Sequence, residues 1–332
     1  MKKVNIAIVG ATGMVGKEIL EILDQRKFPI NDLRLLASKK SAGSIVSFQG
    51  KSLKVEELTE TSFNNIDIAL FSAGGSISER FAPFAVKAGA VVVDNTSHFR
   101  MDPNVPLIVP EVNKHALKNH KGIIANPNCS TAQLVMALKP IHDKAKIKRL
   151  VISTYQSVSG AGKEAVLELE NHSRLLLKGQ DSEPKEFSHK MPFNVIPQID
   201  VFQENGYTKE EMKMIDETQK ILESNIQITA TAVRVPVFIS HSEAVNIQTE
   251  TPISVKEVID SLNEFNGVSI LDNPKEKQYP TPRDISGKDD VYVGRIRKDI
   301  SQKNSIECWI VADNLRKGAA LNAVQIAEEL VK

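Results

Sequence analysis

The sequence predicts an α/β protein of two domains: a Rossmann-type dinucleotide-binding domain, then an α+β domain built on a mixed sheet. Short apolar runs alternate with helical patterns through the first third of the chain. A glycine-rich turn follows the first of those runs, and longer strand-like runs dominate after residue 128. The chain has 332 residues, a length at which two domains are expected.

The first third shows repeated strand and helix patterns. Residues 4–9 form a short apolar run typical of a buried strand, and 13–26 repeat their apolar residues with the period of an amphipathic helix. A second helix is expected over 76–88. Further strands are expected at 33–37, 66–72, 91–94, 107–109 and 122–125. This alternation predicts a mostly parallel, doubly wound sheet.

After residue 128 the pattern changes. A helix is expected over 130–139, where it meets Pro140. The polar stretch 179–190 predicts a loop or flap, and 317–332 predict a final helix. Longer strands separated by helices are expected at 149–156, 229–237, 244–250 and 306–311. Together these runs favour an open mixed sheet in a second domain.

Charge and cysteine content exclude several function classes. The 42 basic and 41 acidic residues leave a net charge of +1, so we expect no general attraction to nucleic acid or membrane. The two cysteines are far apart and show no metal-ligand spacing with the seven histidines, so neither a disulfide framework nor a metal site is expected. The run 4–9 is short and contains Asn5, unlike a signal peptide, and no segment reaches about 18 apolar residues. We therefore expect a cytoplasmic protein.

The turn after the first strand carries a dinucleotide-binding fingerprint. Gly10, Gly13 and Gly16 stand three apart between a strand and a helix, where glycines let the backbone approach a pyrophosphate. The helix N-terminus then binds the negative charge. A plain tight turn is the alternative. The end of the second strand reads Ala-Ser-Lys-Lys-Ser over 37–41, without the carboxylate that an NAD ribose prefers, so NADP is favoured unless the lysines are merely solvated.

Cys129 is the strongest candidate for a nucleophile. It follows Asn-Pro-Asn and precedes Ser-Thr at the start of a predicted helix, where the helix dipole favours a thiolate. A lowered pKa makes a cysteine reactive, although a lone cysteine is more often a small buried hydrophobe. Cys308 lies inside the apolar strand 306–311 and is expected to be core.

Three polar residues are candidates to work with the thiol. His241 lies between two strand-like runs, and Arg234 stands seven residues earlier. On one unbroken strand an odd offset would put them on opposite faces, but Pro236 and the serine-rich turn can reset the alternation. Gln156 ends a strand ahead of a loop of small residues that could approach a ligand. Taken alone, Arg234 or His241 is more often a surface charge or a histidine with a structural role. The alternative for Gln156 is a simple strand-to-helix turn.

Taken together, these motifs resemble the aspartate-semialdehyde dehydrogenase family from end to end. The resemblance rests on Gly-Ala-Thr-Gly-x-Val-Gly at 10–16, Phe-Ser-Ala-Gly-Gly-Ser at 71–76, Val-Asp-Asn-Thr-Ser at 93–97, Pro-Asn-Cys-Ser-Thr at 127–131, Tyr-Gln-x-Val-Ser-Gly-Ala-Gly at 155–162 and His-Ser-Glu at 241–243. It implies a dinucleotide-binding domain over 1–127 completed by a C-terminal helix over 313–332. A catalytic and dimerisation domain like that of glyceraldehyde-3-phosphate dehydrogenase is implied over 128–312, and the family usually forms homodimers.

The resemblance also implies a role for each site residue. Cys129 would be the nucleophile, His241 the acid/base, and Gln156 would orient the intermediate. Arg234 would hold the substrate carboxylate and Glu210 its ammonium group. Lys213 and Arg100 would bind phosphate, with Asn128 also at the substrate. The residues expected to line NADP are Gly10, Thr12, Gly13, Met14, Val15, Lys40, Ser41, Ser159, Gly160 and Asn314.

The implied reaction is the NADPH-dependent conversion of aspartyl-4-phosphate to aspartate semialdehyde and inorganic phosphate through a thioester on Cys129. It would serve diaminopimelate and lysine, threonine and methionine biosynthesis. Two alternatives stay open at this point. An N-acetyl-glutamyl-phosphate reductase shares the chemistry but would have no use for a carboxylate at Glu210, because its substrate amine is acylated. A non-catalytic NADP-binding sensor would not need the set of Cys129, Gln156, Arg234 and His241.

Overall fold

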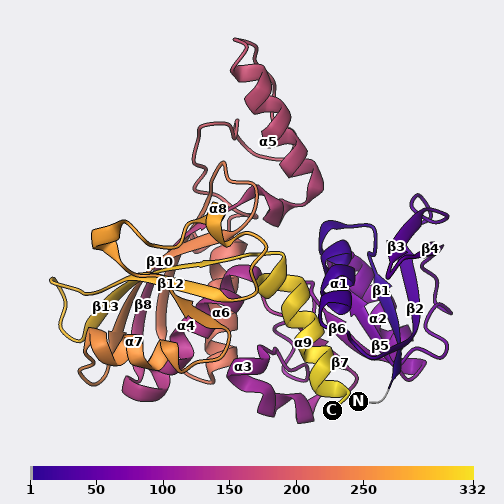
Figure 1. The fold of residues 1–332 in the computed structure, drawn as a ribbon, viewed down its shortest axis with the longest axis horizontal. Helices are drawn as coiled ribbons and strands as arrows, with labels where there is room; N and C mark the ends of the chain where they lie inside the picture. The colour runs from indigo at the N-terminus through magenta and orange to yellow at the C-terminus, as the bar shows by residue number, and fades with distance from the viewer. Residues whose placement is uncertain (1–2) are drawn as a thin grey trace. The chain divides into compact units, whose positions relative to one another are not determined.

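A computed structural model of the protein describes residues 3–332 and shows two compact units (Figure 1). The first unit comprises the chain up to Asn128 together with Ala319–Lys332, and the second comprises Cys129–Gly318. Each unit is built around its own sheet, so the α/β class with a Rossmann-type domain and a second, mixed-sheet domain is confirmed. No helix among residues 3–332 has the length and apolar character needed to cross a membrane.

The first unit contains a seven-stranded sheet in the order β3-β4-β2-β1-β5-β6-β7. All neighbours are parallel except the β3–β4 hairpin, as expected for a doubly wound arrangement with one added edge. Its elements are β1 (Val4–Val9), α1 (Met14–Gln25), β2 (Ile30–Ala37), β3 (Ile45–Phe48), β4 (Lys51–Glu57), β5 (Ile68–Phe71), α2 (Gly75–Lys87), β6 (Val91–Asp94), α3 (Pro110–Asn113), η1 (Lys114–Asn119), β7 (Ile123–Ala125) and α9 (Leu321–Leu330).

Alternate residues of the central strands point to opposite faces of this sheet and pack into two hydrophobic cores, one on each face. Ile6 and Ile8 of β1 belong to the core that α1 and α9 cover, whereas Ala7 and Val9 belong to the core that α2 covers. This two-sided burial explains why β1 is an almost uninterrupted apolar run. Because α9 contributes Leu321, Val324 and other side chains to the first core, the end of the chain completes the first unit.

One prediction for the first unit was wrong, and one hairpin was not predicted. Residues 107–109 do not form a strand, and only an isolated bridge joins Leu107 to Ala125. Pro106 and Pro110 flank this short run and lack the N–H groups that would extend a ladder. The β3–β4 hairpin was not predicted, because its strands are short and mostly exposed, and only Val55 among their residues is fully buried.

The second unit contains a six-stranded mixed sheet in the order β11-β12-β13-β10-β8-β9. The pairs β8–β9 and β11–β12 are parallel, and the other neighbours are antiparallel. Its elements are α4 (Cys129–Ala145), β8 (Ile147–Gln156), η2 (Val158–Ala161), α5 (Lys163–Leu176), α6 (Lys209–Leu222), β9 (Gln227–Arg234), β10 (His241–Thr249), α7 (Val255–Asn263), β11 (Val268–Ile270), η3 (Pro274–Glu276), α8 (Pro282–Ile285), β12 (Val291–Lys298), β13 (Ser305–Ala312) and a π-helix, Arg316–Ala320.

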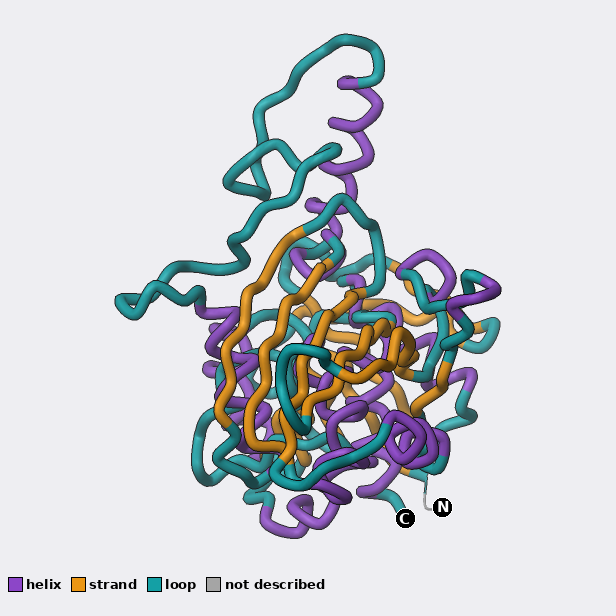
Figure 2. Tube along the Cα trace, turned by 90° about the vertical axis from the view of Figure 1, so that its left-hand side faces the viewer, coloured by secondary structure: helices purple, strands orange, loops and turns teal. Residues whose placement is uncertain are grey.

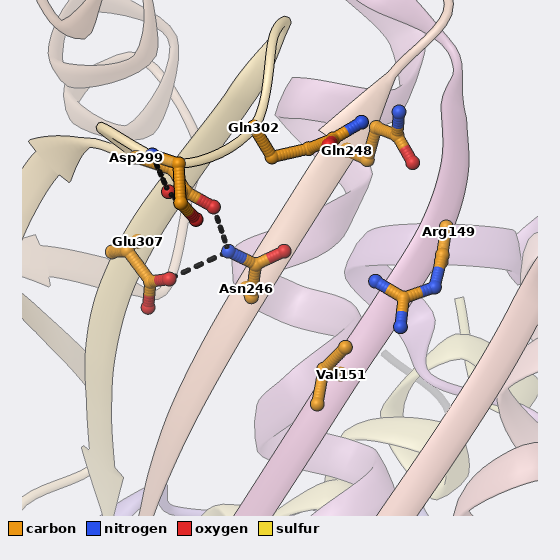
Figure 3. A pocket seen from close by; sticks show the side chains of 8 residues that line it. Arg149, Val151, Asn246, Gln248, Asp299, Gln302 and Glu307 are labelled. Atoms are coloured by element: carbon orange, nitrogen blue, oxygen red, sulfur yellow. Dashed lines mark hydrogen bonds between the residues drawn. The ribbon is translucent and has the colours of Figure 1, made fainter.

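Helices α4, α6 and α7 cover one face of this sheet, and α4 contacts both of the others. Figure 2 looks onto the strands from the opposite side, where helices lie behind them. A cavity of about 540 Å³ on this open face is lined by polar side chains, among them Arg149 and Gln248 (Figure 3). Asn246 donates hydrogen bonds there to Asp299 (2.7 Å) and Glu307 (2.5 Å). The sheet therefore presents a structured polar surface on its uncovered side.

Three predicted boundaries in the second unit shift in the structure. Helix α4 continues through Pro140 to Ala145, although proline removes a helical hydrogen bond at a cost of about 3 kcal/mol. Most of α4 is buried, and this packing compensates the loss. Strand β9 ends at Arg234, two residues before Pro236, whereas β10 begins already at His241.

Helix α5 and the loop that follows it extend from the second unit in both views (Figures 1 and 2). Residues 179–190 form neither helix nor strand, as predicted for a loop. Two backbone N–H groups, of Lys185 and Glu186, donate to the Glu168 carboxylate of α5 at 2.9 and 3.0 Å. The loop therefore folds back on α5 through defined contacts.

Candidate active site

Cys129 is the first residue of α4, so its thiol stands at the positive end of a 17-residue helix. The side chain is partly buried, unlike Cys308, which is fully buried in β13 as predicted. The π-helix approaches closely at Gly318, where a β-carbon would lie only 2.7 Å from the β-carbon of Cys129. The backbone at Gly318 therefore defines one wall around the thiol.

His241 is fully buried at the start of β10. The backbone N–H of Ser157 donates to its Nδ1 at 3.0 Å, and the Ser157 hydroxyl lies 3.1 Å from the same atom. Because an N–H can only donate, Nδ1 carries a lone pair and the neutral ring holds its proton on Nε2. Burial and then the nearby Arg234 lower the pKa of His241 to about 3. The imidazole is therefore neutral with an Nε2–H donor.

Arg234 is the last residue of β9 and is also buried. Its Nη1 donates to the carbonyl of Ser157 at 2.7 Å, which fixes the guanidinium beside the loop after β8. Burial lowers the pKa of Arg234, but the negative charges of Glu210 and Cys129 oppose that shift. Since Arg234 and His241 lie on different strands, both side chains can reach the buried side despite their odd spacing in sequence.

Gln156, Glu210 and Lys213 form a hydrogen-bonded chain. Gln156 at the end of β8 donates to Glu210 Oε1 (3.2 Å), and Lys213 donates to Glu210 Oε2 (3.0 Å). Glu210 and Lys213 lie one turn apart on α6, whose N-terminus is closed by a capping box at Thr208 and Glu211. Burial would lower the pKa of Lys213, but Glu210 and Asp200 outweigh it and raise the value, so the ammonium stays charged.

Gly160 lies directly against the side chains of Arg234 and His241. A β-carbon at this position would lie 3.0 Å from Arg234 Nη1 and 3.2 Å from Cε1 and Nε2 of His241. The second unit therefore brings together the predicted residues Cys129, Gln156, Glu210, Lys213, Arg234 and His241, with Gly160 beside two of them.

Asn314 connects three loops of the second unit. Its Oδ1 accepts hydrogen bonds from Ser157 Oγ, Ser159 Oγ and the Ser240 N–H at 3.2, 3.1 and 2.8 Å. Its Nδ2 donates to Ser159 Oγ at 2.9 Å. Asn314 and Ser159 were predicted to line the cofactor. In the structure Asn314 holds Ser157, which contacts the His241 ring, and Ser240, which precedes His241 in the chain.

The first unit holds the predicted glycine-rich site. A cavity of about 420 Å³ is lined by Gly10, Thr12 and Gly13 after β1, and by Ala37 and Ser38 at the end of β2. Ser72 and Ala73 after β5 line the same cavity; they belong to one of the motifs of the sequence but were not among the predicted site residues.

The geometry of this loop fits a dinucleotide. Gly10 has φ +89°, and a β-carbon there would lie 3.0 Å from the backbone of Ser72. A β-carbon at Gly16 would lie 2.3 Å from the Gly10 carbonyl, so the turn packs tightly on α1. Within the described chain, the first turn of α1 has neither an acidic residue nor a side-chain cap, which leaves its N–H groups for phosphate. Met14 and Val15 open this helix.

The turn after β2 contains the predicted NADP residues. Lys40 is exposed and Ser41 is partly buried, and neither lines the cavity itself, whereas Ser38 does.

Arg100 and Asn128, which were predicted to bind the substrate, also belong to the first unit, and both are buried. Arg100 donates to the backbone carbonyls of Asn126 (2.9 Å) and Asn95 (2.8 Å). Their substrate-binding roles therefore stay predictions.

The sequence reasoning missed Ser157 and Gly318. Ser157 occupies the unspecified position of the motif at 155–162, and its contribution comes mainly from backbone groups, which any residue type supplies. Gly318 carries no side chain, and its importance appears only when the fold places it against Cys129. Neither residue has a chemical signature in the sequence.

Comparison with known proteins covers the whole chain. Residues 5–120 match the family model of the semialdehyde dehydrogenase NAD binding domain, and residues 138–317 match the semialdehyde dehydrogenase dimerisation domain. A relative from Aquifex aeolicus, an aspartate-semialdehyde dehydrogenase, is 54% identical over 98% of both chains. The crystal structure of Vibrio cholerae aspartate semialdehyde dehydrogenase II complexed with ASA has a TM-score of 0.97 and 51% identity, covering 100% of this chain and 99% of that one. The Candida albicans enzyme with NADP has a TM-score of 0.75 and 26% identity over 98% of both chains.

Proposed function

The chain belongs to the aspartate-semialdehyde dehydrogenase family, and we propose that it carries out the family's reaction through Cys129, with His241, Arg234 and Gln156 around the thiol. The activity is that of an NADP-dependent oxidoreductase acting on aspartate semialdehyde and its acyl phosphate. The observation that carries the assignment of roles is the convergence of a helix-terminal cysteine, a neutral buried histidine and a buried arginine in one unit.

The first half-reaction uses the thiolate of Cys129. Its sulfur attacks the acyl carbon of aspartyl phosphate, a C–S bond forms, and the C–O bond to phosphate breaks to release inorganic phosphate. Arg234 is suited to the α-carboxylate because a guanidinium can bind it with two parallel hydrogen bonds. Glu210 matches the substrate ammonium, and Lys213 and Arg100 are the proposed phosphate partners.

The second half-reaction reduces the thioester. When bound, the reduced nicotinamide supplies a hydride to the thioester carbon. The Nε2–H of His241 is available to donate a hydrogen bond to the oxyanion of each tetrahedral species. The oxyanion left by hydride addition then re-forms the carbonyl as the C–S bond breaks, with the thiolate as leaving group. Gln156, held by Glu210, would orient the acyl group. Cleavage of the C–S bond regenerates the Cys129 thiolate and releases aspartate semialdehyde.

We further propose that the chain acts as a homodimer in the cytoplasm. The match of residues 138–317 to a dimerisation domain supports an assembly through the second unit. The open face of its sheet, with the cavity around Asn246 in Figure 3, offers a broad surface for a second copy. Lysine, threonine and methionine synthesis would consume the product.

The test follows NADPH absorbance with aspartate semialdehyde, phosphate and NADP, for the wild type and Cys129→Ala. We expect phosphate-dependent NADPH formation that the variant loses, while NADP binding measured by fluorescence stays nearly unchanged. Equal turnover by the variant would exclude Cys129 as the nucleophile. Turnover with N-acetyl-glutamate semialdehyde in place of aspartate semialdehyde would overturn the substrate and keep the chemistry.

A further inference from the structure

Glu243 is a carboxyl group that the proposed reaction does not use. It lies on β10 two residues after His241, so both side chains point to the same face of the strand. That face is packed against α4, and the side chain of Glu243 is fully buried. A carboxylate in such a place needs hydrogen-bond donors or a counter-charge to offset the loss of water.

In the described part of the chain, the carboxyl group of Glu243 and the amide oxygen of Gln133 are both left without a hydrogen-bond partner. Among residues 3–332, neither carboxyl oxygen of Glu243 has a hydrogen-bond partner, and the same holds for Oε1 of Gln133. The Gln133 side chain lies beside Glu243. The amide orientation of Gln133 is set from its other end, because Nε2 donates to the His241 carbonyl at 3.4 Å. One added proton on Glu243 would provide a donor for the buried Oε1 of Gln133.

We propose that Glu243 is a neutral carboxylic acid whose O–H donates to Gln133, completing a bridge from Glu243 through Gln133 to the His241 carbonyl. Gln133 lies one turn after Cys129 on α4, so the two share a helix face. The bridge would therefore tie the helix that begins with the nucleophile to the strand that begins with His241. Glu243 and Gln133 act as positioning residues, and the inference deepens the proposed function.

The electrostatics of this layer agree with a neutral acid. Burial raises the pKa of Glu243 well above its ordinary 4.5, and the Gln133 amide offsets this only in part. The titratable neighbours are His241 on the same strand, Cys129 one turn before Gln133 on α4, and Cys308 on β13, which pairs with Val245. Burial raises the pKa of Cys308 to about 12, so that thiol brings no charge. On β8 the paired residue is Thr154, which is uncharged.

Two variants separate the protonated from the ionised form. Glu243→Gln keeps a donor at the same place and has no proton to lose, whereas Glu243→Leu keeps the volume and removes the donor. We expect Glu243→Gln to retain kcat within about twofold, and Glu243→Leu to lose about tenfold or more in kcat with little change in KM. Equal loss in both variants would show that an ionised carboxylate is needed, and equal retention would show that the bridge positions nothing.

A readout without turnover keeps this test independent of the proposed reaction. The infrared difference spectrum of wild type minus Glu243→Gln at neutral pH should contain the C=O stretch of a protonated carboxylic acid. If the difference spectrum contained a carboxylate band instead of this C=O stretch, the inference would be overturned even for a fully active enzyme. Because the folded pKa is raised, the wild type should also lose thermal stability relative to Glu243→Gln as pH rises above 4.5 towards the folded value. Parallel stability curves would contradict a neutral Glu243.

Discussion

At the scale of single residues, the contacts of His241 and Arg234 with Ser157 decide what each side chain can do. The Ser157 N–H donates a hydrogen bond to Nδ1 of the His241 imidazole, and the Ser157 carbonyl accepts a hydrogen bond from the Arg234 guanidinium. One loop residue thus sets both the tautomer of the histidine and the place of the arginine. The residue types at 234 and 241 suggested charge and proton transfer, but their orientation depends on backbone groups of another strand.

Arg234→Lys is expected to reduce kcat/KM for aspartate semialdehyde about 100-fold. A lysine keeps one positive charge but loses the two-pronged contact with a carboxylate and the bond to the Ser157 carbonyl. Steady-state kinetics with both substrates would measure this loss. NADP affinity should be unchanged, and an equally large loss of NADP binding would place Arg234 at the cofactor and not at the substrate.

His241 should make the wild-type protein sensitive to acid. Because its folded pKa is depressed from 6.5 to about 3, it contributes stability above pH 6.5 that is lost as pH falls towards the folded value. The melting temperature of the wild type should therefore fall faster than that of His241→Gln between pH 6.5 and about 3. If both curves fell in parallel, the histidine would not be neutral in the folded protein.

At the scale of elements, the N-terminus of α4 and the π-helix Arg316–Ala320 form the surroundings of the thiol together. The helix dipole acts on Cys129 because it is the first residue of α4. The π-helix comes close enough that only glycine fits at position 318. Unusual helical turns of this kind occur often at functional sites.

Gly318→Ala is expected to lower kcat about 100-fold, since its β-carbon would lie 2.7 Å from that of Cys129 and displace the thiol. Rapid-quench or steady-state kinetics would report the loss, and alkylation of Cys129 by iodoacetamide would report the altered thiol directly. Gly75→Ala is a matched control, because its β-carbon meets no atom closer than 3.9 Å. Unchanged kcat in Gly318→Ala would mean that the π-helix yields without moving Cys129.

At the scale of the whole molecule, the second unit covers only one face of its sheet with helices. The other face carries polar residues such as Asn246 that are linked to Asp299 and Glu307. A surface of this kind suits a partner that matches it in shape and charge, as in the homodimer proposed above.

Val151→Arg should convert the dimer to monomers, because a long cation on the open face would prevent a second sheet from packing there (Figure 3). Light scattering coupled to size exclusion would measure the mass. Asn263→Arg, at the exposed end of α7 on the covered side, is the control and should remain dimeric. A dimeric Val151→Arg would show that the copies associate through another surface.

The sequence by itself determined the α/β class, the glycine-rich turn after β1 and most strand positions, because these follow from apolar periodicity and from glycine. The resemblance of its motifs also predicted Gln156, Glu210, Lys213 and His241 as site residues near Cys129 and Arg234, but not Ser157. Only the tertiary structure decided that α4 runs through Pro140, that 107–109 form no strand, and that β3 and β4 pair. It also decided the proton position on His241, the close approach of Gly318 and the burial of Glu243. These depend on contacts between segments far apart in the chain, which local periodicity does not contain.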